Sequence, residues 1–108
     1  MKELPAGSSV LDAGCGGGDF SLGLRDARFN VFGSDLSETG IEHANKLMPE
    51  GHFEVASVYE DLAKPFSVMS FDGIVCVEVI EHLYSPATFA ERAFQALRPG
   101  GILVITTP

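Results

Sequence analysis

The residues best suited to chemistry are a glycine run and two carboxylates near the start of the chain. The run Gly14–Gly18 follows a short apolar segment, and Asp12 lies within that segment. Glycines let the backbone pass close to a ligand, and a helix that begins after them offers unpaired N–H groups. Asp35 ends a second apolar run about twenty positions further on, where a carboxylate can accept both hydroxyls of a ribose. Together these features predict a nucleoside site.

The charges around the glycine run separate two classes of nucleoside ligand. A dinucleotide-binding turn would have another glycine three positions after Gly16, where this chain has Asp19. Asp12 adds a second carboxylate, and the two acids would repel a pyrophosphate. The sulfonium and ammonium groups of S-adenosylmethionine would be attracted to them instead. We therefore expect S-adenosylmethionine, and we keep a nicotinamide-dependent oxidoreductase as the alternative.

The elements that must position these residues follow from the pattern of apolar runs. Short apolar runs alternate with amphipathic stretches, which favours β-α-β units around a mostly parallel sheet. Helical spacing of apolar residues begins at Phe20, a second helix follows a cap at Ser37, and a third follows Ser85 and Pro86. We expect the side chains of Phe20 and Phe89 in the core. The predicted strands are 9–13, 30–35, 52–56, 71–77 and 102–105.

Length and composition limit what the chain can be. Its 108 residues, 45% hydrophobic and 20% charged, predict a single compact domain over residues 1–108. A net charge of −8 with only seven Lys and Arg disfavours nucleic acid as a partner. No apolar run predicts a membrane span or a secretory signal, so we expect a cytoplasmic protein in which Cys15 and Cys76 are reduced thiols.

Four segments of the chain resemble the class I S-adenosylmethionine-dependent methyltransferases. Residues 10–18 resemble motif I of that family, 33–37 its acidic loop, 71–75 its fourth strand, and 97–101 its turn into strand five. The order and spacing of these segments fit across nearly the whole chain. The resemblance implies an α/β fold: a Rossmann-like three-layer α/β/α sandwich with a parallel sheet of order 3-2-1-4-5, without the family's last two strands.

The resemblance also implies which residues hold the cofactor. Asp12 would reach the methionine ammonium group, Asp35 would hold the ribose, and Leu36 would pack on the adenine. The backbone of the glycine run and of the end of strand four would contact the methionine portion. The loop after strand three would meet the adenine edge, at positions where many relatives have an acidic residue and this chain does not. The predicted cofactor-binding residues are Asp12, Gly14, Cys15, Gly16, Asp35, Leu36, Ser57, Val58 and Val77.

The segment 77–83 is the clearest indication of the subclass. If it is helical, Glu78, Glu81 and His82 stand at i, i+3 and i+4 and share one face. The segment resembles the ubiquinone-biosynthesis O-methyltransferases and the small-RNA 2′-O-methyltransferases, where matching residues are associated with a divalent cation. Two carboxylates and one imidazole would suit magnesium, manganese or zinc. The alternatives are an orienting histidine among solvated carboxylates, or a His82 that acts as a base on the acceptor.

The function implied is methyl transfer to an oxygen or nitrogen of a small-molecule acceptor. The transfer would be an in-line displacement, with His82 and Glu78 as catalytic residues facing the acceptor. A module that binds S-adenosylmethionine without catalysis is an alternative. The family normally continues beyond strand five, so we expect a fragment of a longer protein. An uncovered fifth strand would then lead to self-association or to a marginal fold.

Overall fold

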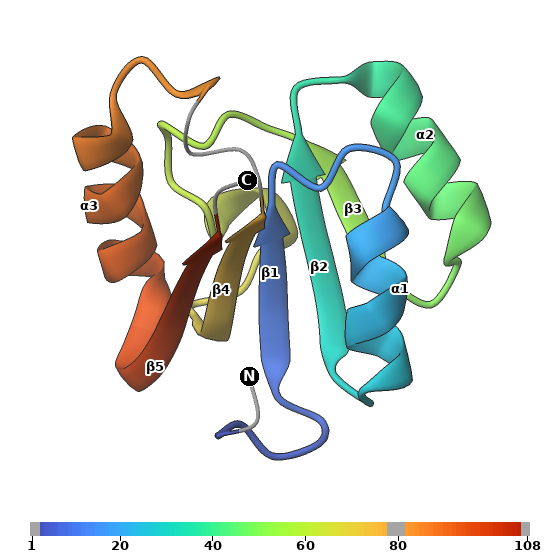
Figure 1. Ribbon diagram of the computed structural model, residues 1–108, viewed down its shortest axis with the longest axis horizontal. Helices are drawn as coiled ribbons and strands as arrows, with labels where there is room; N and C mark the ends of the chain where they lie inside the picture. Colours follow the sequence, from blue (N-terminus) through green and yellow to red (C-terminus); the bar gives the residue numbers. More distant parts are fainter. Residues whose placement is uncertain (1–2, 78–81, 107–108) are drawn as a thin grey trace.

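The computed structural model describes residues 3–77 and 82–106, and within them five parallel strands form one sheet of order β3-β2-β1-β4-β5 (Figure 1). The strands are β1 (Ser9–Ala13), β2 (Asn30–Asp35), β3 (His52–Val55), β4 (Phe71–Val77) and β5 (Leu97–Thr106). The helices are α1 (Asp19–Asp26), α2 (Glu38–Leu47), α3 (Pro86–Ala96) and a short 3-10 helix, η1 (Lys64–Phe66). The predicted Rossmann-like fold and strand order are confirmed.

Helices cover both faces of the sheet and make three layers. Successive side chains of a strand point to opposite faces. From β1, Leu11 packs in the core that includes Phe89 of α3, whereas Val10 packs in the core that includes Leu24 of α1 and Ile41 of α2. One face is therefore covered by α1 and α2 and the other by α3 and η1, with a separate hydrophobic core on each side.

Two of the three α-helices begin at the capping serines that the sequence predicts. The Ser37 hydroxyl accepts a hydrogen bond from the Gly40 N–H at 3.0 Å, and the Ser85 hydroxyl accepts one from the Thr88 N–H. Such bonds satisfy N–H groups that the first turn of a helix leaves without a partner. Helix α1 instead begins after Gly18, which has a positive φ of 92° and no capping side chain. The glycine run therefore continues directly into α1.

The expectation that Phe20 lies in the core is wrong, whereas Phe89 is fully buried as expected. The Phe20 side chain is 46% exposed and borders a groove beside α1, together with Val77 and Val104. Helical spacing places Phe20 on the same side of α1 as Leu24, which is buried. However, no helix of the described residues covers β4 and β5 on this face (Figure 1), and Phe20 lines the groove that is left there.

Strand β5 begins five residues earlier than predicted, at Leu97 directly after α3. Leu97 pairs with Phe71, and the next pair is Ile102 with Gly73, so residues 98–101 form an irregularity in the ladder. The Asp72 carboxylate lies beside it and accepts hydrogen bonds from the Ser9 N–H and the Arg98 guanidinium. These two donors lower the pKa of Asp72.

Strand β5 also forms one edge of the sheet, and its Ile105 side chain is 41% exposed. Self-association through this edge stays a prediction.

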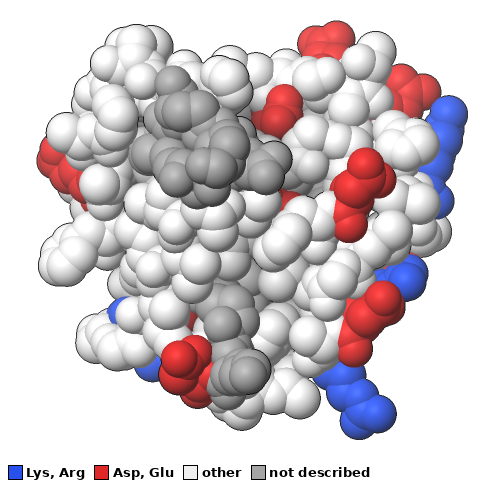
Figure 2. All heavy atoms as spheres, in the orientation of Figure 1, with Lys and Arg blue, Asp and Glu red and all other residues white. Residues whose placement is uncertain are grey.

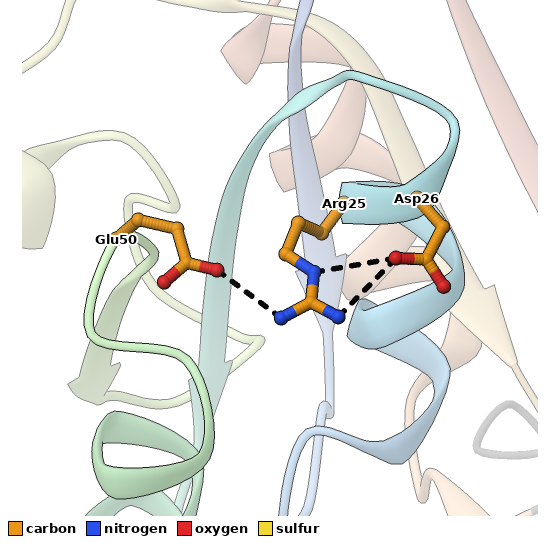
Figure 3. A network of polar contacts seen from close by, with 3 residues as sticks. All are labelled: Arg25, Asp26 and Glu50. Carbon is orange, nitrogen blue, oxygen red and sulfur yellow. Dashed lines mark hydrogen bonds and ion pairs between the residues drawn. The ribbon is translucent and has the colours of Figure 1, made fainter.

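Charged side chains of the described residues form small networks on the surface. On the face shown in Figure 2, Lys and Arg side chains lie in separate groups at the margins. Arg25 in the last turn of α1 contacts Asp26 at 3.2 Å and Glu50, which follows α2, at 3.3 Å (Figure 3). Exposed ion pairs of this kind contribute little stability. Among the described residues, no helix is long and apolar enough to cross a bilayer.

Candidate functional site

The glycine run and Asp35 meet at the carboxyl edge of the sheet. Strands β1 and β2 pair in parallel with Ala13 opposite Ser34, so the segments that follow them emerge side by side. One oxygen of the Asp35 carboxylate accepts the Gly16 N–H and the other accepts the Ser37 N–H, both at 2.9 Å. Each carboxylate oxygen can accept a further hydrogen bond. Asp35 is therefore fixed in place and still able to bind hydroxyl groups.

The backbone amides of the glycine run are largely used within the protein. The Gly14 and Cys15 N–H groups both donate to the Ser34 carbonyl, at 2.8 and 2.9 Å, and the Gly18 N–H donates to the Cys15 carbonyl. Gly16 has a positive φ of 55°, which favours glycine over other residues. A phosphate-binding turn directs its amides toward the anion. Here four of these amides, including that of Gly16, already have partners, one of which is a carboxylate.

Asp12 lies beneath the glycine run and is only 2% exposed. Its carboxylate accepts a hydrogen bond from the Ser21 hydroxyl of α1 at 2.7 Å. Burial raises the pKa of Asp12 to about 6, because the charged form is poorly solvated; the Ser21 bond opposes this shift and the charge of Asp35 adds to it. A cationic ligand group near Asp12 would therefore stabilise its ionised form.

Cys15 belongs to the run but its side chain faces the core. The thiol is buried among the residues that α1 and α2 cover, and Gly33 of β2 lies directly beside it. Burial raises the pKa of the Cys15 thiol to about 12, and the charges of Asp12 and Asp35 contribute to this rise. Because the thiolate is the reactive form, this cysteine is chemically inert near neutral pH.

A cavity of about 290 Å³ opens beside Asp35. Most of its wall is apolar, with the Asp35 carboxylate among a few polar groups, which is the usual character of a small-ligand site. It brings together six of the predicted site residues, namely Gly14, Asp35, Leu36, Ser57, Val58 and His82. The other lining residues are Ala56, Tyr59, Leu83 and Tyr84. A larger cavity, of about 460 Å³, lies between η1 and α3 and contains none of the predicted residues.

Four of the predicted cofactor residues do not line this cavity, namely Asp12, Cys15, Gly16 and Val77. Gly16 lies beside it, because its N–H donates to the Asp35 carboxylate. Asp12 and Cys15 are buried below the glycine run. Val77 ends β4, and its side chain borders the groove beside α1. The prediction for Val77 concerned its main chain, which ends the strand at the same edge of the parallel sheet as Asp35.

The predicted cation site is only partly covered by the structure. Glu78 and Glu81 lie outside the described residues, whereas His82 is exposed and lines the cavity. Within residues 3–77 and 82–106, no three His, Cys, Asp or Glu side chains come together as metal ligands. The cation therefore stays a prediction.

Sequence reasoning missed two aromatic residues of the cavity, Tyr59 and Tyr84. Their ring centroids are 4.5 Å apart, and the Tyr59 hydroxyl accepts a hydrogen bond from the Tyr84 N–H at 3.1 Å. Each follows the end of a strand by a few positions, which places it at the carboxyl edge. Their place after a strand end could have marked them as site residues. However, the sequence after β3 has too weak a pattern to predict that Tyr59 and Tyr84 contact each other.

Comparison with known proteins places this arrangement among methyltransferases. A family model described as "Methyltransferase domain" matches residues 1–108. The chain is 37% identical over 97% of its length to a 2-methyl-6-phytyl-1,4-hydroquinone methyltransferase of Synechocystis, and 38% identical over 94% to a ubiquinone biosynthesis O-methyltransferase of Mesorhizobium japonicum. It spans 33% and 41% of those two relatives.

A solved structure supports the same relationship. An S-adenosylmethionine-dependent methyltransferase from Mesorhizobium loti superimposes with a TM-score of 0.83 at 29% identity, over 96% of this chain and 49% of that protein.

Proposed function

Because the chain belongs to the methyltransferase domain family, we propose that it binds S-adenosylmethionine in the cavity beside Asp35 and serves methyl transfer to a small-molecule acceptor. The observation that carries this proposal is the contact between the Asp35 carboxylate and the Gly16 N–H. It joins the acid proposed to bind the ribose to the glycine run, so both parts of the proposed adenosine site border the same place.

The residues present fit the cofactor. The Asp35 carboxylate would accept the ribose hydroxyls, and the adenine would lie between Leu36 and the loop that contains Val58. Leu36 is 71% exposed, which leaves an apolar surface available to a base. The negative charge of Asp12, below the loop, would favour the ammonium and sulfonium groups. When bound, S-adenosylmethionine supplies a methyl group attached to a positively charged sulfur.

The protein would contribute chiefly by orientation. A cavity that fixes donor and acceptor at near-attack distance removes much of the entropic barrier to displacement. His82 lines the cavity and is exposed, so it can take a proton from an oxygen or nitrogen nucleophile that reaches the site. The same proposal includes Glu78 as a second catalytic residue. It also includes a cation held by Glu78, Glu81 and His82.

Both alternatives can be weighed against the site. A nicotinamide cofactor is disfavoured because its pyrophosphate would meet Asp12 and a glycine run whose amides have internal partners. A module that binds S-adenosylmethionine without catalysis is the other alternative, and a measurement of methyl transfer separates it from an enzyme. A cytoplasmic location is part of the proposal and is supported by two buried cysteines, Cys15 and Cys76, that form no disulfide among the described residues.

Calorimetry with S-adenosylhomocysteine tests the binding site. We expect binding by the protein and an affinity loss of about tenfold or more in Asp35→Ala, because hydrogen bonds to a charged acceptor are lost. Asp26→Ala is the matched control, since Asp26 is an exposed acid that contacts only Arg25 in its described ion pairs. NAD⁺ should not bind. Equal affinity in Asp35→Ala and the unaltered protein would refute the site.

Catalysis needs a separate measurement. Transfer of a labelled methyl group to a panel of phenols and amines would show activity, and His82→Ala should lower the rate without abolishing cofactor binding. Tight cofactor binding without transfer to any acceptor would favour the binding-only alternative.

A further inference from the structure

The outer wall of the cavity is made by two loops that are distant in the sequence. Residues 57–59 follow β3 and residues 82–84 precede α3, and both line the cavity. Tyr59 joins them, because its hydroxyl accepts the Tyr84 N–H at 3.1 Å and its ring lies 4.5 Å from the Tyr84 ring. The two loops are therefore held at a fixed separation by one side chain.

Tyr59 is itself held by two further contacts. Its N–H donates to the Ser57 hydroxyl at 3.1 Å, and its carbonyl accepts the Arg92 Nε–H of α3 at 2.9 Å. The residue thus connects the loop after β3, the loop before α3 and α3 itself. The main chain of Tyr59 is fixed by the Ser57 and Arg92 bonds, and its side chain is fixed by Tyr84, so the residue is suited to setting the shape of the wall.

The side chain of Tyr84, unlike that of Tyr59, is mostly exposed to solvent. Its side chain is 86% exposed, although the backbone beside it is tied to Tyr59. Leu36, on the rim of the same cavity, is 71% exposed. Two large, exposed apolar side chains around one cavity mark surface that a ligand can cover. An aromatic ring held at its backbone provides such a surface with little loss of conformational freedom.

We propose that Tyr59 is a positioning residue that holds Tyr84 as the outer wall of the cavity, against which the adenosine portion of the ligand packs. The identity of the ligand rests on the function proposed above. The positioning role is separate from it, since it depends on the contacts of Tyr59 and not on those of Asp35 or the glycine run.

The chain offers a direct optical signal for this proposal. It contains no tryptophan and two tyrosines, and these are Tyr59 and Tyr84. The intrinsic fluorescence of the protein above the phenylalanine range therefore reports on this pair alone. Saturation with S-adenosylhomocysteine should change the tyrosine fluorescence, because the ligand would cover the Tyr84 ring.

The decisive experiment compares Tyr59→Phe with Tyr84→Phe. Tyr59→Phe removes the acceptor of the Tyr84 N–H, whereas Tyr84→Phe keeps that bond and removes a hydroxyl that has no hydrogen bond among the described residues. By calorimetry with S-adenosylhomocysteine, Tyr59→Phe should weaken binding about three- to tenfold, and Tyr84→Phe should stay within about twofold of the unaltered protein. Equal affinities in all three proteins would overturn the positioning role.

Two further measurements keep the outcome unambiguous. If Tyr59→Phe fails to fold, Tyr84→Ala replaces it, because its exposed ring can be removed without disturbing the core; it should weaken binding about threefold or more. An unchanged affinity in Tyr84→Ala would overturn the proposal that the ligand packs against Tyr84. No fluorescence response to saturating ligand in the unaltered protein would overturn it as well. If the unaltered protein binds no S-adenosylhomocysteine at all, the proposed function itself fails.

Discussion

Asp12 links the stability of the protein to its proposed ligand. Its carboxylate is almost fully buried, and its partner is the neutral hydroxyl of Ser21. A buried carboxylate without a counter-ion is destabilising when ionised, which is why its pKa rises to about 6. The ligand-free protein therefore bears a strain near neutral pH that a sulfonium or ammonium group would relieve.

Asp12→Asn should stabilise the ligand-free protein at pH 8. The amide keeps an acceptor for Ser21 but carries no charge. A folded-state pKa of about 6 against an ordinary value of 3.8 corresponds to at most about 3 kcal/mol. The sign follows from the raised pKa: the protonated carboxyl favours the folded state below pH 3.8, and this contribution is lost as the pH rises through 6. Urea unfolding at pH 8 and pH 4 measures the difference.

The stabilisation by Asp12→Asn should be large at pH 8 and should shrink toward pH 4. Asp26→Asn is the control, since Asp26 is exposed and its replacement should change the stability by less than about 0.5 kcal/mol. A pH-independent effect of Asp12→Asn would contradict the assignment of the strain to its charge.

The affinity for S-adenosylmethionine should rise with pH through about 6. The ligand's positive groups favour the ionised form of Asp12, so binding below that pH requires loss of a proton. Isothermal titration between pH 5 and 8 measures this dependence. Asp12→Asn isolates the contribution of Asp12, because only that contribution disappears in the variant. A pH profile unchanged by Asp12→Asn would rule out a role for its charge in binding.

Cys15 should not react with thiol reagents in the folded protein. The pKa of the thiol is raised to about 12, so little thiolate is present at neutral pH. The side chain is only 8% exposed, so a reagent has little access to it. With a disulfide reagent at pH 8, both cysteines should react slowly in buffer and rapidly in urea. Fast modification of Cys15 in the native state, located by mass spectrometry, would contradict the burial of the thiol.

The carboxyl end of β2 depends on the absence of a side chain at Gly33. A Cβ there would lie 2.5 Å from the Phe53 ring and 3.0 Å from the Cys15 Sγ. Both neighbours are buried and belong to one packed core, so neither can move aside easily. The close approach of β3 and the glycine run to β2 therefore requires glycine at this position.

Gly33→Ala should lower the free energy of unfolding by about 1–3 kcal/mol through overpacking. Gly23→Ala is the matched control, since Gly23 lies in α1, where an added Cβ would meet no atom within 4 Å. That change should instead raise stability by about 0.5–1 kcal/mol through helix propensity. Urea denaturation compares the two, and equal effects of the two substitutions would contradict the packing around Gly33.

Much of the fold could be predicted because it depends on local patterns. The strand runs, the cap residues Ser37 and Ser85, and the glycine run before α1 can each be recognised within a few residues of sequence. The start of β5 could not be predicted, because it depends on the pairing of Leu97 with Phe71, 26 residues away, and on the Asp72–Arg98 contact. Pairing partners distant in sequence leave no local signal.

The site, like the fold, could be predicted from the sequence only in part. Asp35 and the glycine run could be identified because their residue types and spacing are tied to one chemistry, and the fold brings them together. The Tyr59–Tyr84 contact could not, because it arises from two loops that the sheet places side by side. The exposure of Phe20 likewise depends on which elements cover β4 and β5, and not on its spacing within α1.

The most direct test of the account is a crystal structure of the protein with S-adenosylhomocysteine. We expect the two ribose hydroxyls within hydrogen-bonding distance of the Asp35 carboxylate, and the adenine between Leu36 and the loop that follows β3. The amino group of the ligand should lie on the side of the glycine run above Asp12. A ligand bound elsewhere, or a ribose turned away from Asp35, would contradict the central claim that this acid and the glycine run form one adenosine site.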